Sequence, residues 1–327
     1  MGCPAGIGPE IILRHFSGQE QSSDIQSVVL GDRKVLEKCG ADLKLPAPCV
    51  SWSPGSPLPE NCIPVIQLSA LEFADIEWGR PNKATGSAMA QYIEAAVKLA
   101  QQGYIHGVAT CPISKSSLNE AGYHFPGHTE MLASLTGSKS FAMMMAGNTL
   151  RVTLVTIHCP LREVANGLTI DSVYNMIRIT QQALMIDFGI KAPRIAVAGL
   201  NPHGGENRLF GCEEEKIIGP AIKRAWLDNM NVSGPYPPDT VFFKASSGEF
   251  DAVVCMYHDQ GLIPFKLLHF DDGVNITLGL PIVRTSVDHG TAYDIAGKGL
   301  ASHRSLGEAV RLAAVISRNR AIHNRLG

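Results

Sequence analysis

Three histidines are candidate metal ligands because each comes directly after a short apolar run that is typical of a β-strand. They are His158 after residues 152–157, His203 after residues 195–202 and His258 after residues 252–257. In an open α/β sheet, ligands bind beyond the carboxyl ends of the strands. Three imidazoles placed there can hold one metal ion and leave a coordination position open for substrate. Their positions alone are equally compatible with unrelated core or surface histidines.

A second set of polar residues has the chemistry of an anion site. Gly127-His-Thr-Glu130 precedes an apolar run, which predicts a helix capped by His128 or Thr129, with free backbone amides that favour an anion. Further along the chain come Lys266, Asn275 and Arg284. Two cations and an amide are groups that bind a phosphate and a carboxylate. Taken singly, each of these residues is also ordinary at a plain helix cap or on a protein surface.

Two loops that combine glycines with polar side chains are candidate ligand-binding segments. Asn201-Pro-His-Gly-Gly-Glu206 has paired glycines, which permit a tight turn and a close approach of the backbone to a ligand. Residues 288–299 place small residues between polar anchors, so this segment can wrap a nucleotide, although a plain surface loop has the same composition. No Gly-x-Gly-x-x-Gly follows a strand, so a Rossmann fingerprint is absent.

The candidate residues lie on a chain in which predicted strands and helices alternate. Strands are expected at 25–30, 104–110, 194–199 and 251–256, with a hairpin of 141–146 and 150–157 around Gly147-Asn148. Helices are expected near 33–39, 85–102, 170–188, 213–227 and 305–320, and residues 45–64 are expected to be irregular. This alternation predicts an α/β fold with a mostly parallel sheet and some antiparallel strands.

The composition is that of an ordinary globular protein and removes several classes of function. The chain has 327 residues, 45% of them hydrophobic, and a net charge of −2, and this length fits two domains or two lobes. It has no block of lysine and arginine that would attract nucleic acid or an anionic membrane. No apolar stretch is long enough to span a bilayer, and no signal peptide is visible. The eight cysteines form no Cys-x-x-Cys pair, which indicates reduced thiols and a cytoplasmic protein.

Six motifs occur in order across nearly the whole chain. They are Pro4-Ala-Gly-Ile-Gly-Pro-Glu10, Gly127-His-Thr-Glu130, Asn201-Pro-His203, Tyr236-Pro-Pro-Asp-Thr240, Tyr257-His-Asp-Gln-Gly261 and Arg284-Thr-Ser-Val-Asp-His-Gly-Thr-Ala292. Together they resemble the 4-hydroxythreonine-4-phosphate dehydrogenase family of vitamin B6 (pyridoxal 5'-phosphate) biosynthesis. Residues 289–299 also resemble the adenosine-binding loop of isopropylmalate and isocitrate dehydrogenases. This likeness implies their two-lobed α/β/α fold, an active cleft between the lobes and a homodimer.

The resemblance also implies how the chain is divided and what it does. Residues 1–125 and about 280–327 would form the first lobe, on the cofactor side, and about 126–279 the second lobe, with the metal, the substrate and the dimer interface. The implied reaction is oxidation of 4-phosphohydroxy-L-threonine, with NAD and a divalent metal (Zn, Mg, Co or Mn). The resulting β-keto acid then loses CO2 to give 3-amino-2-oxopropyl phosphate.

Each candidate residue receives a role from the resemblance. The implied metal ligands, shared across the dimer interface, are His158, His203 and His258. The implied substrate-binding residues are His128, Thr129, Lys266, Asn275 and Arg284. The implied cofactor-binding residues are His289, Gly290, Thr291, Ala292 and Asp294. Lys266 or Asp259 is the candidate base, and Asp239 is a further acidic residue near the metal.

The chain departs from the family pattern mainly at its start. The family motif reads Gly-Asp-Pro-Ala-Gly-Ile-Gly-Pro after a strand, whereas here Cys3 takes the acidic position and no room is left for the strand. We therefore expect a truncated or wrongly chosen start, or a dispensable strand. Gly204 replaces a more usual alanine, and Ser114 replaces an amide residue. None of these changes touches an implied metal ligand.

Three other functions compete with this assignment. The nearest is the same chemistry on D-threonate or D-erythronate 4-phosphate, because no motif reads the substrate amino group. A metal-dependent hydrolase or phosphotransferase would not need the adenosine loop that residues 289–299 resemble. A non-catalytic binding protein is suggested by the short start alone, and the retained ligands argue against it.

Overall fold

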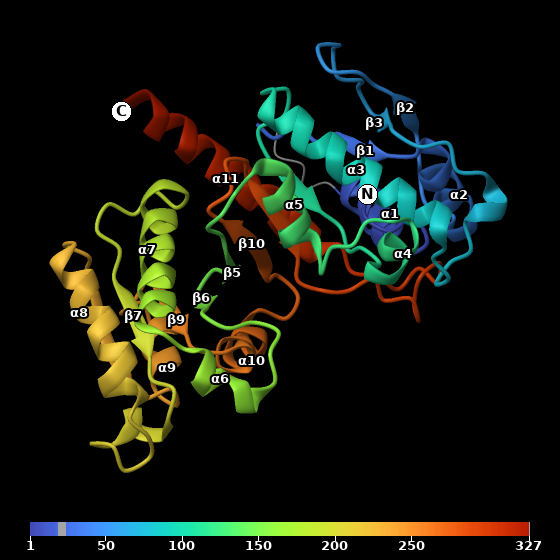
Figure 1. The fold of residues 1–327 in the computed structure, drawn as a ribbon. Coiled ribbons are helices and arrows are strands. Elements are labelled where there is room, and N and C mark those ends of the chain that lie inside the picture. The colour runs from blue at the N-terminus through green and yellow to red at the C-terminus, as the bar shows by residue number, and fades with distance from the viewer. Residues whose placement is uncertain (19–23, 327) are drawn as a thin grey trace. The chain divides into compact units, whose positions relative to one another are not determined.

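The computed structural model describes residues 1–18 and 24–326, which divide into two compact units. Unit 1 consists of Met1–Lys139 and Leu280–Ala314, and unit 2 consists of Ser140–Gly279 and the chain from Val315 on. Figure 1 labels their helices and strands in chain order. Both units mix helices with strands, and most strand pairs are parallel, so the predicted fold class is confirmed. Within the described ranges, no helix is both long and apolar enough to cross a membrane.

Unit 1 contains a small parallel sheet in the order β1-β3-β2, and a parallel pair of β4 with β11. Its strands are β1 (Val29–Gly31), β2 (Cys49–Ser51), β3 (Ile63–Gln67), β4 (Val108–Thr110) and β11 (Arg284–Val287). Its helices are α1 (Gly8–Ser17), α2 (Arg33–Leu43), the 3-10 helix η1 (Phe73–Asp75), α3 (Lys83–Gln101), α4 (Lys115–Glu120) and α5 (His128–Thr136). The last helix, α11 (Arg304–Leu326), begins in unit 1 and ends in unit 2.

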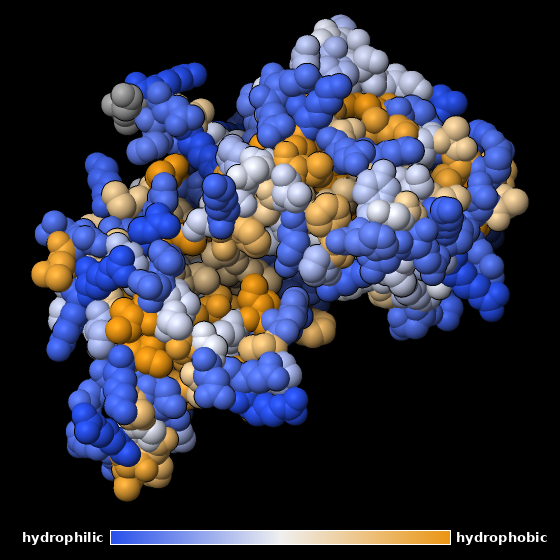
Figure 2. All heavy atoms as spheres, in the orientation of Figure 1, coloured by the Kyte–Doolittle hydropathy of each residue, from blue (hydrophilic) through white to orange (hydrophobic). Residues whose placement is uncertain are grey.

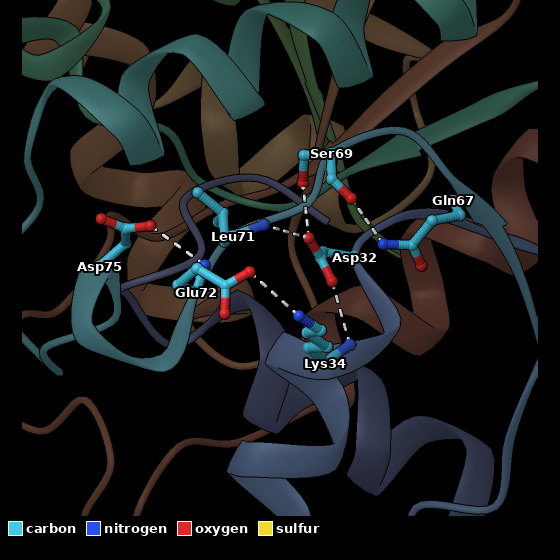
Figure 3. A network of polar contacts seen from close by, with 7 residues as sticks. All are labelled: Asp32, Lys34, Gln67, Ser69, Leu71, Glu72 and Asp75. Carbon is cyan, nitrogen blue, oxygen red and sulfur yellow. Dashed lines mark hydrogen bonds and ion pairs between the residues drawn. The ribbon is translucent and has the colours of Figure 1, made fainter.

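A buried carboxylate holds the small sheet of unit 1 together (Figure 3). Asp32 directly follows β1 and caps α2 by accepting a hydrogen bond from the backbone N–H of Lys34 at 3.0 Å. Its other oxygen accepts from the Ser69 hydroxyl and the Leu71 N–H, both at 2.9 Å. A buried carboxylate is costly unless it is hydrogen-bonded, so these three bonds fix the end of β1 against the segment after β3.

Helix α3 forms where its sequence pattern predicts. Asn82 and Thr85 form a reciprocal capping box at its start, with backbone-to-side-chain bonds of 2.8 and 3.0 Å. Met89, Ile93 and Val97, which share one face of the helix, are all buried. The periodic apolar face therefore anchors α3 against the rest of unit 1.

Two expectations about the strands of unit 1 were wrong. Residues 45–64 are not irregular throughout, because β2 and the start of β3 lie there and pair in parallel. The strand expected at 104–110 is reduced to β4, because the Tyr104 N–H closes the end of α3 on the Leu99 carbonyl and sheet pairing begins only at Val108. Both strands depend on partners that are distant in sequence, so local composition is a poor guide to them.

Unit 2 is built on strands in the order β10-β5-β6-β9-β7-β8. They are β5 (Ala142–Ala146), β6 (Arg151–Leu154), β7 (Ile195–Ala198), β8 (Val232–Tyr236), β9 (Ala252–Cys255) and β10 (Val274–Leu278). The helices are α6 (Leu161–Gly167), α7 (Ile170–Ile186), the 3-10 helix η2 (Pro202–Gly205), the π-helix η3 (Glu214–Ile218), α8 (Gly219–Leu227), α9 (Val241–Ser246) and α10 (His258–His269). The β5–β6 hairpin is confirmed and antiparallel, whereas β6, β9, β7 and β8 run parallel.

Helix α10 packs closely over the ends of β6 and β9. A Cβ atom on Gly261 would lie 2.8 Å from the Leu154 side chain and 3.0 Å from Cys255 Sγ, so a larger residue here would force these side chains to shift. Val253 and Cys255 of β9, which share one core cluster with Leu262 and Phe265 of α10, are fully buried. The start of α10 is therefore held at the carboxyl end of β9.

Candidate active site

The three predicted metal ligands follow three neighbouring parallel strands of unit 2. His158 follows β6, His258 begins α10 just after β9, and His203 lies in η2 just after β7. Strand β9 pairs in parallel with β6 on one side and β7 on the other. Parallel neighbours end at the same edge of a sheet, so all three histidines lie along the edge where ligands bind in open α/β folds.

Two of these histidines are close enough to bind one ion together. The ring centroids of His158 and His258 are 5.8 Å apart, and the rings are tilted by 39°. Nδ1 of His258 lies 2.7 Å from a carboxylate oxygen of Asp259. When Nδ1 donates its proton to Asp259, Nε2 keeps its lone pair and can bind a metal at about 2.0–2.1 Å. The pair, with its orienting carboxylate, fits two positions of a divalent-metal site.

His203 does not join this pair within one chain. Its ring stands 6.1 Å from that of Phe210, and the described residues contain no group of three His, Cys, Asp or Glu side chains placed to hold a metal. Asp239, predicted near the metal, lies exposed in the turn between β8 and α9. One chain therefore brings together two imidazoles, and the third is on a neighbouring loop.

The loop that carries His203 has an unusual backbone. His203 has a φ of 53°, and every following residue as far as Arg208 (φ 77°) also has a positive φ. A left-handed conformation costs about 1–2 kcal/mol for each residue other than glycine. Gly204 and Gly205 avoid this cost at two of the positions. Backbone strain of this kind persists only where surrounding contacts enforce it.

Glu214, which the sequence motifs do not single out, supports this strained loop. Glu214, in η3, is 6% exposed, and its carboxylate accepts hydrogen bonds from the Leu200 and Asn201 N–H groups at 2.8 and 2.7 Å. A Cβ on Gly205 would lie 2.6 Å from the same carboxylate. The only indication of this role in the sequence is the run of three acidic residues at 213–215, which closely follows the Asn-Pro-His motif.

In unit 1, the predicted anion-binding residues gather around α5 and β11. Helix α5 begins at His128, but its N-cap is Gly127, which has no capping side chain, so the expectation that His128 or Thr129 caps the helix was wrong. Neither side chain closes the first turn, and both are half-buried. Arg284, on β11, is 3% exposed and donates from Nε and Nη2 to the Thr110 hydroxyl at 3.2 and 2.9 Å.

The charges of this region are tuned by burial. Burial, reinforced by the positive charge of Arg284, holds the pKa of the His128 imidazole well below its ordinary value. Burial also lowers the pKa of the Arg284 guanidinium to about 10, against the opposing effect of the nearby Glu130 carboxylate. At neutral pH, Arg284 is therefore cationic and His128 is neutral. A desolvated cation beside a neutral imidazole and free helix amides is suited to an anionic group of a ligand.

The other predicted substrate-binding residues, Lys266 and Asn275, lie in unit 2. Lys266 is on α10, two turns beyond His258, and its Nζ is 5.9 Å from the centre of the Phe270 ring. Asn275 is on β10 opposite Met145 of β5. Its Oδ1 is buried and accepts no hydrogen bond from any described residue. A buried orphan acceptor is costly, and such an atom often has a role in ligand binding.

The predicted cofactor loop follows β11 in unit 1 and is held by the N-terminal segment. The carbonyl of Thr291 accepts a hydrogen bond from the Ile7 N–H at 3.2 Å. Tyr293 donates to Sγ of Cys3 at 3.6 Å, and burial raises the pKa of that thiol. Cys3 is therefore a protonated thiol and a weak hydrogen-bond acceptor for this loop.

The remaining residues of this loop leave both backbone and side-chain groups available. Ala292 has a φ of 43°, which brings the loop into a left-handed turn. Nδ1 of His289 lies 3.1 Å from the Gly290 carbonyl, while its buried Nε2 has no partner among the described residues. Gly290 and Asp294 are exposed. The buried Nε2 is a further atom suited to contact with a bound molecule.

Comparisons with known proteins give one consistent result. The chain matches the family model described as pyridoxal phosphate biosynthetic protein PdxA over residues 23–313. It is 50% identical over 318 residues to a 4-hydroxythreonine-4-phosphate dehydrogenase from Desulforapulum autotrophicum, covering 96% of this chain and 93% of the relative. A relative from Oceanobacillus iheyensis, named as a D-threonate 4-phosphate dehydrogenase, is 43% identical over 317 residues, covering 96% of this chain and 95% of the relative. The crystal structure of 4-hydroxythreonine-4-phosphate dehydrogenase from Klebsiella pneumoniae, 40% identical, matches with a TM-score of 0.89 over 97% of this chain and 98% of that chain.

Proposed function

The chain belongs to the PdxA family of pyridoxal phosphate biosynthetic proteins, and from that premise we propose that it oxidises 4-phosphohydroxy-L-threonine with NAD and a divalent metal. As a member of this family it is an oxidoreductase. The β-keto acid formed by the oxidation loses CO2 and yields 3-amino-2-oxopropyl phosphate. The observation that carries the proposal is the pair of His158 and His258, 5.8 Å apart at the carboxyl edge of the unit 2 sheet.

The metal would be held by His158 and His258 of one chain, with His203 as the third ligand. When bound, a divalent ion lowers the pKa of a coordinated hydroxyl and stabilises negative charge on a neighbouring oxygen, and NAD accepts a hydride. Asp259 keeps the His258 ring in the tautomer and orientation that metal binding requires. His203→Ala should remove bound metal and activity together, and full activity without metal in this variant would refute the ligand assignment.

Side chains near the proposed metal ligands and at the start of α5 would transfer the proton and bind the substrate. One carboxylate oxygen of Asp259 is engaged by His258, so we assign the role of base to Lys266, on the same helix, rather than to Asp259. Arg284, with His128 and Thr129 at the start of α5, would bind the substrate phosphate or carboxylate. Oδ1 of Asn275, which is buried and has no partner among the described residues, would accept a hydrogen bond from a substrate donor.

NAD would bind at the loop of residues 289–294. Nε2 of His289 is buried and has no hydrogen-bond partner among the described residues, and Ala292 has a left-handed backbone; both features suit a loop that binds a ligand. The backbone bond between Ile7 and Thr291 fixes this loop to α1. Adenosine contact with His289, Gly290, Thr291, Ala292 and Asp294 is the specific form of this proposal.

We further propose a homodimer in which His203 of one subunit completes the metal site of the other. Helix α10, which carries His258, exposes Ile263 and Leu267 at 68% and 84%, and Phe270 just beyond it is 75% exposed. Figure 2 shows apolar side chains gathered on the part of unit 2 where α9 and α10 lie in Figure 1. Clustered exposed apolar side chains mark protein interfaces.

The reaction is tested by following NADH formation with three substrates, each with and without a chelator. We expect reduction of NAD with 4-phosphohydroxy-L-threonine and loss of that activity on chelation. A faster reaction with D-threonate 4-phosphate, which the name of the Oceanobacillus relative suggests, or with D-erythronate 4-phosphate would favour the alternative activity. No reduction with any of the three would refute the dehydrogenase assignment.

The shared site is tested by mixing two inactive variants, His203→Ala and His258→Ala. A hybrid dimer has one intact site if His203 acts across the interface, so random exchange should restore about a quarter of wild-type activity. If each chain builds its own complete site, every site in the mixture lacks a ligand and no activity returns. The second result would refute the shared site without affecting the metal assignment.

A further inference from the structure

Gln260 links the loops that carry two of the proposed metal ligands. It lies in the first turn of α10, two residues after His258, and is 6% exposed. Its Oε1 accepts a hydrogen bond from the Met256 N–H at the end of β9, and its Nε2 donates to the Gly199 carbonyl at the end of β7, both at 2.6 Å. One buried amide therefore satisfies a donor on one strand end and an acceptor on the next.

The link continues on both sides of Gln260. On the β6 side, Thr156 donates from its N–H and its hydroxyl to the Met256 carbonyl, at 3.1 and 2.8 Å. On the β7 side, the Glu214 carboxylate accepts hydrogen bonds from the backbone N–H groups of Leu200 and Asn201, which directly follow Gly199. These bonds run across the carboxyl ends of β6, β9 and β7, the same three ends that His158, His258 and His203 follow.

The Glu214 carboxylate also binds the side chain of Asn201, two residues before His203. Its second oxygen accepts from the Asn201 side-chain amide at 3.0 Å, and Glu213 accepts from the same amide at 2.8 Å. The left-handed backbone from His203 to Arg208 begins two residues later. A strained segment needs enforcing contacts, and these part-buried hydrogen bonds are among the contacts at its start.

We propose that Gln260 and Glu214 are positioning residues that hold the His203 loop in its strained conformation and tie it to the strand end that bears His258. Neither residue binds metal in this proposal. These contacts preorganise the His203 loop for metal binding. Removing either of them should therefore weaken metal binding, although every ligand is still present. The proposal rests on the three-histidine metal site proposed above.

The variants separate the hydrogen bonds from the bulk of the side chains. Gln260→Glu keeps the acceptor for Met256 but places a carboxylate oxygen against the Gly199 carbonyl, so it breaks the link at one end. Glu214→Leu removes the acceptor for both loop amides. Glu214→Gln keeps one carbonyl oxygen for these amides and gives up only the bond from the Asn201 side chain, which still donates to Glu213, so it is the conservative variant. Gln182→Met, at an exposed position on α7, is the matched control for loss of a glutamine.

Two readouts are taken on the full-length, metal-free protein. Co2+ affinity is measured from the visible spectrum of the bound ion, at a temperature where circular dichroism shows each variant folded. Hydrogen exchange is measured for a peptide covering residues 199–208. We expect about 10–100-fold weaker Co2+ binding in Gln260→Glu and Glu214→Leu, with faster exchange of this peptide before metal is added. Glu214→Gln and Gln182→Met should stay within a few-fold of wild type.

The outcomes distinguish this proposal from the one on which it rests. Wild-type affinity and wild-type exchange in Gln260→Glu and Glu214→Leu, alongside lost binding in His258→Ala, would overturn the positioning role and leave the metal site standing. No Co2+ binding by the wild-type protein would overturn both. Weaker binding with unchanged exchange of residues 199–208 would also overturn the positioning role, because the loop would not have been released.

Discussion

The depressed pKa of His128 predicts that the free energy of unfolding decreases as the pH is lowered through the range where an ordinary histidine titrates. Burial, and secondarily the charge of Arg284, holds the pKa of the folded-state imidazole well below the ordinary value of 6.5. The unfolded chain takes up a proton near 6.5, while the folded chain does not. Lowering the pH through 6.5 therefore favours the unfolded state, and raising it restores stability.

The size of this effect follows from one proton. For a single group, the slope approaches about 1.4 kcal/mol per pH unit once the pH lies well below the unfolded-state value. Between pH 7.5 and 5.5, wild type should therefore lose about 1.4 kcal/mol of unfolding free energy more than His128→Gln, which lacks the titrating group. A bound phosphate beside the imidazole favours its charged form, so saturating phosphate should flatten the difference.

Urea unfolding followed by fluorescence at several pH values measures this difference directly. His124→Gln, at an exposed position in the same segment, controls for the loss of an imidazole. Other groups titrate in both proteins, so the quantity of interest is the gap between the two curves as a function of pH. Parallel curves for wild type and His128→Gln between pH 7.5 and 5.5 would refute the reasoning.

Three other substitutions probe single contacts. Arg284→Met should abolish the rise in melting temperature that inorganic phosphate gives wild type, because the buried cation of the anion site is gone; an undiminished rise would place the anion elsewhere. Asn275→Leu removes a buried acceptor without a partner in the described chain, so unfolding free energy should hold or rise by about 1 kcal/mol while KM increases; a loss above 2 kcal/mol would contradict the orphan assignment. Arg320→Met strips the two bonds, 2.6 and 3.0 Å, from the buried Asp187 and should cost about 3–5 kcal/mol in urea unfolding; a cost below 1 kcal/mol would show that Asp187 does not need this partner.

The sequence predicted those features of the site that depend on local pattern. The apolar runs before His158, His203 and His258 are β6, β7 and β9 with their short extensions, and parallel pairing places their ends at one edge. Helix α3 was predictable because its buried face repeats with the helical period. The mixed α/β class followed from the alternation of such segments.

What could not be predicted depends on contacts between distant residues. The link from Gln260 to Gly199 joins residues 61 positions apart, and nothing in the Tyr257-His-Asp-Gln-Gly261 motif indicates which carbonyl the glutamine reaches. Strand β2 is three residues long and owes its existence to pairing with β3. The left-handed run after His203 is likewise invisible in a sequence where only two of the six residues are glycine.

The discontinuous composition of unit 1 has a consequence for how the protein is made. Thr110 at the end of β4 and Arg284 at the start of β11 are 174 residues apart, and the whole segment Ser140–Gly279 is translated between them. At about 5–20 residues per second, a ribosome needs roughly 10–35 s to cover that distance. Strand β4 spends this interval without its partner β11, while most of unit 2 is already complete. The strands of unit 2 can therefore pair with one another before β4 meets β11, and the unpaired edge of β4 in that interval is a natural point for chaperone engagement or for aggregation.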